Sequence, residues 1–454
     1  MIKVTIRVVA LAAIVLASGS AVAGFTPGLW QAAVISVATI SLWATGALPE
    51  DQTALIFFVA ASLLGLVRPD VVFSGFATTA FWLVFGGLVI GAAVRRSGLD
   101  VIIARPILHF AHGSYWRVVF AIILLSLVLS FLVPSSMTRV MLTIPVVLAL
   151  TEELGVTEGR GKLGLVAAAL LASYYFGSGL LPANVPNMAL VGSAEKVLPV
   201  HFRFAEYFIT YFPVLGLLKT ALAGVLISVA FDSPIRGKPP QVASVEPKGE
   251  GHRLVAIVLL AALLFWVTDF MHGISPAWIA MIAALIFLFP GVDIVPLEQF
   301  GRLVNVRPLF FVAGILGLGS FIAASGLGVA AAQHLSAWAG LKSDGSIREA
   351  ALLTGIATTL GLLATHGGMA ALMPTLAKDL AAASGLSIDV VIGTIVVGYS
   401  ILLLPYQVPP SVVGFQMAAI PARSAVLTTL WIGLVTSAVT VPLQFLWWRA
   451  IGFL

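Results

Sequence analysis

Two short polar runs interrupt long apolar stretches of the sequence, and their residue types suit the binding of a small anion. The first is Pro134-Ser135-Ser136-Met137-Thr138-Arg139, and the second is Ala364-Thr365-His366-Gly367-Gly368. The planar fork of Arg139 could bind a carboxylate or sulfate through two parallel hydrogen bonds. His366 could donate to an anion, or titrate and link binding to pH. Structural alternatives stay open, since arginine can snorkel to a membrane interface and a neutral histidine can cap a helix.

Two further interruptions place proline beside amide or hydroxyl side chains. They are Asn184-Val185-Pro186-Asn187 and Gln407-Val408-Pro409-Pro410-Ser411. A broken helix of this kind frees backbone carbonyls that can hold an ion, and helix starts attract anions. The predicted substrate contacts are Ser135, Ser136, Thr138, Arg139, Asn187, Thr365, His366, Pro410 and Ser411. The predicted ion contacts are Ser135, Ser136, Asn184, Thr365 and Gln407.

The composition excludes most soluble classes of protein. Of 454 residues, 60% are hydrophobic, only 9% are charged, and cysteine is absent. A typical soluble domain carries roughly 25% charged residues, so this chain is expected to lie in a lipid bilayer. The net charge of +5 is too dispersed for nucleic-acid binding, and thiolate metal sites or disulfides are impossible. We predict no cofactor, and no metal other than a coupling Na⁺.

The apolar stretches predict an all-α polytopic membrane protein with about eleven transmembrane helices. A helix needs roughly 20 apolar residues to cross the hydrocarbon core. Candidate spans lie at about 8–25, 29–48, 52–67, 79–95, 159–183, 206–230, 253–271, 275–290, 308–324, 388–405 and 424–449. The first is either a retained span or a signal peptide. Residues 117–150 and 349–383 each contain one of the polar runs, and each is predicted to be a re-entrant hairpin.

The two halves of the chain repeat. Val84-Phe85-Gly86-Gly87-Leu88-Val89-Ile90-Gly91 matches Val312-Ala313-Gly314-Ile315-Leu316-Gly317-Leu318-Gly319, and Ser-Gly-Leu follows each at the same distance. An odd number of crossings per half makes this an inverted-topology repeat. The predicted divisions are an N-terminal span 1–28, a first repeat 29–230, a linker 231–252 and a second repeat 253–454.

Lysine and arginine before the first span and in the linker predict that both segments are cytoplasmic. The basic residues concerned are Lys3, Arg7, Arg236, Lys238, Lys248 and Arg253. The C-terminus is then expected to be external. We also expect the chain to lie in a bacterial inner membrane.

These motifs resemble the divalent anion:sodium symporters of the wider ion-transporter superfamily. Trp43-Ala44-Thr45-Gly46-Ala47-Leu48-Pro49 is similar to their Trp-x-Thr-Glu-Ala-Leu-Pro signature, and the run from Pro134 to Arg139 resembles their Pro-Ser-Asn-Thr-Ala-Arg. The resemblance implies a homodimer in which a mobile domain carries substrate past a fixed scaffold in an elevator motion. It also implies that the two hairpin tips bind substrate carboxylates and sodium.

The sequence departs from the family pattern at both tips. Ser136 and Met137 stand where the family has Asn and Thr, and Ala364-Thr365-His366 replaces its second Ser-Asn-Thr. Fewer side-chain oxygens are therefore available, and hard cations favour oxygen ligands. Sodium coupling, proton coupling and exchange all stay open.

The predicted function is secondary active transport of a small anion, either a di- or tricarboxylate or sulfate, and not an enzymatic activity. One alternative is another superfamily member, such as a metalloid-oxyanion permease or a Na⁺/H⁺ antiporter. An intramembrane hydrolase using Gly177-Ser178-Gly179 and His366 is a further alternative, although such small-residue runs are common at helix contacts.

Overall fold

Every regular element in the described part of the chain is helical, which confirms the all-α fold class. The computed structural model describes residues 27–45, 48–109, 114–156, 158–235, 251–327, 340–363 and 365–454. Residues 1–26 of the predicted N-terminal span, most of the linker and Ala364 lie outside these residues.

Five described helices are long and apolar enough to cross a membrane, by length and composition alone. They are Thr79–Ser97, Tyr115–Leu132, Phe204–Ala230, Arg307–Ala324 and Ala422–Ala450. A bent pair, His366–Ser384 with Ile388–Ser400, meets the same test as one broken span, with an angle of 119°. Shorter apolar helices lie at Pro27–Trp43, His252–Val267 and Pro276–Leu288. The count of eleven spans and the inverted repeat stay predictions.

The chain divides into two compact units, and each unit draws on both halves of the sequence. Unit 1 contains the described parts of Met1–Trp82, Pro186–Phe202 and Val306–Tyr399. Its helices are α2 (Pro27–Thr45), α3 (Glu50–Leu64), α4 (Pro69–Val72), η1 (Ser74–Ala77), α10 (Val185–Val197), α17 (Arg307–Ala324), α19 (Ile347–Leu363), α20 (His366–Leu372), η6 (Met373–Leu376), α21 (Ala377–Ser384) and α22 (Ile388–Ser400).

Unit 2 contains the described parts of Leu83–Val185, Arg203–Asn305 and Ser400–Leu454. Its helices up to residue 230 are α5 (Thr79–Ser97, from Leu83 on), α6 (Leu99–His109), α7 (Tyr115–Leu132), α8 (Ser136–Glu153), α9 (Gly159–Ser178), η2 (Leu181–Ala183), α11 (Phe204–Tyr211), the π-helical η3 (Phe212–Leu218) and α12 (Lys219–Ala230). The later ones are α13 (His252–Val267), α14 (Asp269–His272), α15 (Pro276–Leu288), η5 (Leu297–Gln299), α16 (Phe300–Leu303), η7 (Pro405–Gln407), α23 (Pro409–Met417) and α24 (Ala422–Ala450).

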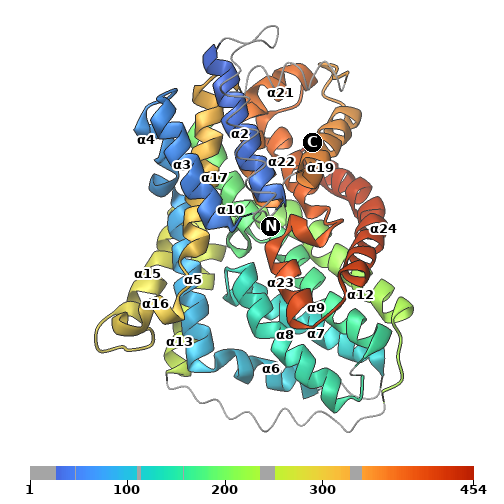
Figure 1. Ribbon diagram of the computed structural model, residues 1–454. Helices are drawn as coiled ribbons and strands as arrows, with labels where there is room; N and C mark the ends of the chain where they lie inside the picture. The colour runs from blue at the N-terminus through green and yellow to red at the C-terminus, as the bar shows by residue number, and fades with distance from the viewer. Residues whose placement is uncertain are drawn as a thin grey trace. The chain divides into compact units, whose positions relative to one another are not determined.

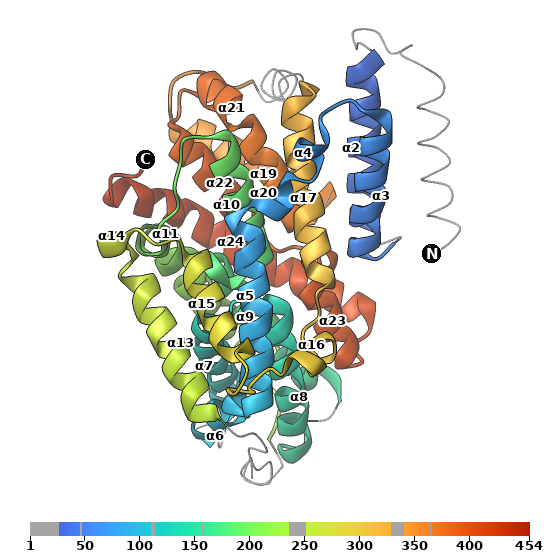
Figure 2. The ribbon, with the colours of Figure 1, turned by 90° about the vertical axis from the view of Figure 1, so that its left-hand side faces the viewer.

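Unit 1 is built around α17. This helix packs against α3, α4, η1 and α20, and α2 lies beside α3 (Figure 2). Arg307 at the start of α17 donates two hydrogen bonds of 2.9 Å to the carboxylate of Asp51 in α3. An edge-to-face contact of 5.5 Å between the rings of Trp43 and Phe311 joins α2 to the same helix. Segments from the two halves of the sequence therefore share one core.

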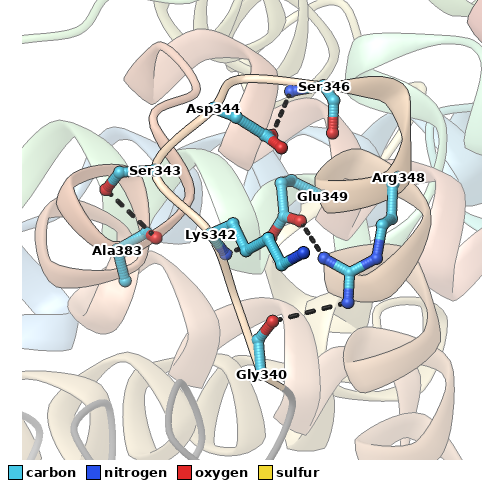
Figure 3. Close-up of polar contacts among 8 residues, drawn as sticks. All are labelled: Gly340, Lys342, Ser343, Asp344, Ser346, Arg348, Glu349 and Ala383. Carbon is cyan, nitrogen blue, oxygen red and sulfur yellow. Dashed lines mark hydrogen bonds and ion pairs between the residues drawn. The ribbon is translucent and has the colours of Figure 1, made fainter.

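A polar loop fastens the start of α19 to the end of α21 (Figure 3). The Lys342 backbone N–H donates to the buried carboxylate of Glu349 over 3.0 Å, and Arg348 forms an ion pair with the same group. The Ser343 hydroxyl donates to the Ala382 carbonyl over 2.7 Å. These contacts join the outer ends of the segment predicted as the second hairpin.

Unit 2 packs the first predicted hairpin against elements from the far end of the chain. The helices α7, α8 and α9 contact one another, α12 and α24 pack against α9, and α23 packs against α8 and α9 (Figure 1). Between α7 and α8 the chain is extended at Val133 and Ser135. Two helices joined by a short break are therefore present where the hairpin of 117–150 is predicted.

Two predicted spans are interrupted earlier than their apolar composition indicates. The stretch 159–183 is helical only to Ser178, and 388–405 is helical only to Ser400. Proline in a helix interior removes a hydrogen bond and clashes with the carbonyl four residues before it. After the breaks, Pro182 is the second residue of the short 3-10 turn η2 and Pro405 is the first residue of η7. Apolar composition measures burial in lipid or protein, and it does not mark where a helix ends.

Candidate functional site

The tip of the first hairpin is organised by its own hydroxyl groups. Ser135 precedes α8 in an extended conformation, and its hydroxyl oxygen accepts the backbone N–H of Thr138 over 3.3 Å. The Thr138 hydroxyl donates to the same oxygen over 3.0 Å. A side-chain acceptor at this position satisfies one of the donors that a helix start leaves without a partner. Ser135 and Thr138 therefore shape the tip.

Arg139 is completely buried behind this tip, and all of its N–H groups are used. Its Nη1 donates to the carbonyls of Val133 and Ala183, each over 2.8 Å. Its Nη2 donates to the Ser136 hydroxyl over 3.1 Å and to the Ser173 carbonyl over 3.0 Å, and Nε donates to the Ser173 hydroxyl over 3.1 Å. Arginine has five N–H donors, so this set of bonds is complete.

The five bonds tie three parts of unit 2 together. Val133 precedes the tip, Ser173 lies in α9, and Ala183 ends η2 at the first helix break. Ser136 reinforces the connection by donating to the Ala183 carbonyl over 3.3 Å. The geometry supports a positioning role for Arg139, which holds the tip against the residue that precedes Asn184. Its predicted contact with substrate stays a prediction.

The second helix break is also held by a buried side chain. The Gln407 carbonyl oxygen accepts the backbone N–H groups of Leu403 and Leu404, each over 2.8 Å. These two residues lie in the non-helical segment that follows α22. Pro410 and Ser411 stand in the first turn of α23, which packs against α8. Unit 2 thus brings the first tip and the second break into one packed group of helices.

Loss of this acceptor is expected to loosen the second break. In Gln407→Leu, two buried or half-buried N–H groups lose their partner, and we expect the protein to be destabilised by on the order of 2 kcal/mol. Gln407→Glu keeps a carbonyl acceptor and should lie closer to wild type. Thermal unfolding of the detergent-purified protein measures both. Wild-type stability in Gln407→Leu would contradict the role assigned to this side chain.

Unit 1 holds the remaining predicted residues. Thr365 precedes α20, and its hydroxyl oxygen accepts the backbone N–H of Gly368 over 3.3 Å. His366 follows it and is completely buried. The helix α10, which carries the buried Asn187, is joined to α20 because the Ser193 hydroxyl donates to the Ala371 carbonyl over 2.6 Å. The second tip and the helix after the first break are therefore brought together within unit 1.

The sequence did not reveal three of the groups that accept hydrogen bonds from Arg139, and one further charged residue, Lys219, was overlooked. The carbonyls of Val133, Ser173 and Ala183 carry no sequence signal, because any residue supplies a carbonyl. Lys219 did carry a signal, since it is a charged residue in the middle of an apolar segment. The structure buries it completely in unit 2. Within the described ranges, no group of three or more His, Cys, Asp or Glu residues could hold a metal ion.

A family model described as citrate transporter matches residues 40–398, which is most of the chain. The protein belongs to the citrate transporter family. It is therefore a multi-pass membrane transporter and not an enzyme, and the intramembrane hydrolase alternative is set aside.

Two curated relatives are similar to most of this chain. A membrane protein of Cupriavidus necator is 23% identical over 93% of this chain and 84% of its own length. The sodium-dependent dicarboxylate transporter SdcS of Staphylococcus saprophyticus is 22% identical over 88% of this chain and 82% of its own. The family model and the second relative confirm the resemblance to the divalent anion:sodium symporters.

The same fold is found in the crystal structure of the Alcanivorax borkumensis YdaH transporter, which is described as having an unusual topology. The match has a TM-score of 0.57 at 17% identity and covers 99% of this chain and 97% of that one. At this identity the similarity concerns the fold alone. The transporter described here shares that helical architecture.

Proposed function

We propose that this protein carries a small di- or tricarboxylate across the bacterial inner membrane by secondary active transport. The family description names citrate, and a relative over most of the chain is named a dicarboxylate transporter. Substrates of both kinds carry two or three carboxylates at neutral pH. A site for them needs several donors of hydrogen bonds and little negative charge.

The observation that carries the proposal is the braced tip of the first hairpin. Arg139 holds the start of α8 against the first helix break. The hydroxyl groups of Ser135, Ser136 and Thr138 lie at this helix start. The start of an α-helix offers backbone N–H groups and a partial positive charge to an anion. A fixed helix start of this kind favours a carboxylate without requiring a side-chain cation. We assign Ser135, Ser136 and Thr138 to substrate contact on this basis.

The remaining parts of the mechanism are inferred from the family resemblance. We propose that Thr365, His366, Asn187, Pro410 and Ser411 complete the substrate contacts, and that Asn184, Gln407, Ser135, Ser136 and Thr365 surround the coupling ion. The coupling ion is Na⁺ in this proposal, because several relatives are named sodium-dependent. Transport proceeds by an elevator movement in a homodimer. The placement of lysine and arginine, and not the resemblance, supports a cytoplasmic N-terminus and an external C-terminus.

Uptake into proteoliposomes tests the proposed function directly. Labelled citrate, succinate, malate and sulfate are offered with an inward Na⁺ gradient, an inward H⁺ gradient, or an internal store of unlabelled anion. We expect accumulation of at least one carboxylate above protein-free vesicles and a weaker response to sulfate. Absence of flux for every anion under all three conditions would contradict the proposal. The three conditions also separate sodium coupling, proton coupling and exchange.

A further inference from the structure

Lys219 is a buried charge that the proposed transport site does not use. It lies within the apolar helical segment Phe204–Ala230, where the other charged residue, Glu206, is in the first turn. The Lys219 side chain is completely buried. Charged groups inside membrane helices are costly, and they usually mark a functional position.

The surroundings of the Lys219 ammonium are those of a bound cation. Its Nζ atom donates to the Ser400 carbonyl over 2.8 Å, to the Ser437 hydroxyl over 3.1 Å and to the Ser400 hydroxyl over 3.4 Å. The same atom lies 5.0 Å from the centre of the Tyr175 ring. Carbonyl and hydroxyl oxygens are the ligands of hard cations, and an aromatic face attracts positive charge.

Among the described residues, no carboxylate forms an ion pair with Lys219, because none of the four ion pairs includes it. The neighbouring helices α9 and α24 contribute Tyr175 and Ser437, and Ser400 is the residue at which α22 ends. Within the part of the chain that the structure describes, the positive charge is therefore held by carbonyl and hydroxyl dipoles and one aromatic face, as an ion would be.

The position of Ser400 relates this pocket to the transport mechanism. The chain leaves the helical conformation after Ser400, and the second helix break extends from there to Val408. Carbonyl groups at the ends of broken helices are where transporters with broken helices coordinate coupling cations. Lys219 also follows directly on the π-helical segment η3, and such segments occur frequently at functional positions.

We propose that the Lys219 ammonium is a built-in cation that occupies a cation position at the second helix break. This inference rests on the proposed function, because it concerns how that transporter is coupled. A covalently attached cation cannot diffuse away, so the protonated Lys219 side chain supplies a positive charge at Ser400 without binding Na⁺. Transport would then use fewer Na⁺ ions than in a protein with an empty pocket here, and exchange of anions becomes possible without Na⁺ bound at Ser400.

Thermal unfolding of the full-length protein in detergent tests the proposal without substrate. Wild type, Lys219→Ala and Lys219→Ser are compared while choline chloride is replaced by NaCl or methylammonium chloride at constant ionic strength. In both variants the side chain is short, so the oxygens of Ser400 and Ser437 lose their cation and the space it filled is left open. We expect added Na⁺ or methylammonium to raise the Tm of these variants by about 5 °C more than that of wild type, through preferential binding to the folded state.

Lys219→Met is the matched control. Methionine fills much of the volume of the lysine stem but leaves neither a charge nor a vacant cation pocket, so no extra cation response is expected and uptake should be lost. An equal Na⁺ response in wild type, Lys219→Ala and Lys219→Ser would overturn the proposal. If the alanine and serine variants do not fold, normal uptake by Lys219→Met overturns it instead. Absence of anion flux in wild type would count against the proposed function alone, since the Tm comparison requires no transport.

Discussion

Arg139→Ala is expected to abolish anion uptake and to destabilise the protein. The change removes five hydrogen bonds and leaves the carbonyls of Val133, Ser173 and Ala183 buried without these donors. The Ala183 carbonyl keeps the Ser136 hydroxyl as a donor. A buried acceptor that loses its partner costs about 1–3 kcal/mol, so the loss at Val133 and Ser173 is expected to total about 2–6 kcal/mol. Without the hydrogen bonds of Arg139, the start of α8 is no longer held against the first helix break. Thermal unfolding and proteoliposome uptake measure the two effects.

Arg139→Lys separates a positioning role from direct binding of substrate. Lysine keeps the charge but offers three donors from one atom, so it cannot reproduce the fork that reaches Val133, Ala183 and Ser173. We expect intermediate stability and a lower maximal rate, with KM close to wild type. A large rise in KM without any loss of stability would contradict the positioning role of Arg139. It would indicate instead that Arg139 binds the anion.

Gly433→Ala is expected to lower stability and anion uptake more than any other change except Arg139→Ala, because it displaces the second helix break. A Cβ atom at Gly433 in α24 would lie 2.1 Å from the carbonyl oxygen and 3.1 Å from the carbonyl carbon of Leu402. Both are backbone atoms, so the helix or the break must move. Such overpacking typically costs about 1–3 kcal/mol. Because the displaced break belongs to the proposed transport site, we also expect uptake to fall by about tenfold, which corresponds to an activation free energy higher by about 1.4 kcal/mol.

Gly355→Ala provides the control for the glycine substitution. Gly355 lies inside α19, and a Cβ atom there would have no neighbour within 4 Å. Alanine is favoured over glycine in a helix by up to about 1 kcal/mol, so this variant should be as stable as wild type or more so. If Gly433→Ala and Gly355→Ala have equal stability and equal uptake, the close approach of α24 to the Leu402 carbonyl does not matter for the second break.

The two buried cations of unit 2 differ in how they are held. Arg139 joins three separate backbone segments through the five hydrogen-bond donors of its planar guanidinium. Its role depends on the number and direction of these donors and not on its charge. Lys219 places a compact charge between oxygens and one aromatic face. Arginine is suited to fixed multivalent contacts and lysine to a point charge. We therefore assign positioning to the first and charge compensation to the second.

The helical membrane class and the helix breaks could be predicted from the sequence. A charged fraction of 9% leaves too few polar groups for a soluble surface. The combination of proline with amide or hydroxyl side chains marked the two breaks, whereas Pro145 and Pro442 lie inside the continuous helices α8 and α24. The motif around Trp43 and the polar run ending at Arg139 also pointed to the family that the comparisons confirm. These features are local, because composition and proline geometry act within a few residues.

The partners of the buried groups were decided by the tertiary structure. Arg139 binds groups 34 and 44 residues later in the chain, and Lys219 binds groups 181 and 218 residues later. Most of these acceptors are carbonyls or single serines, which have no distinctive spacing. Their selection depends on which helices pack together, and the two compact units mix both halves of the chain. The sequence alone therefore showed where the charged residues and the helix breaks lie along the chain. Helix packing determined that Arg139 holds the tip of the first hairpin and that Lys219 binds the end of α22 at the second break.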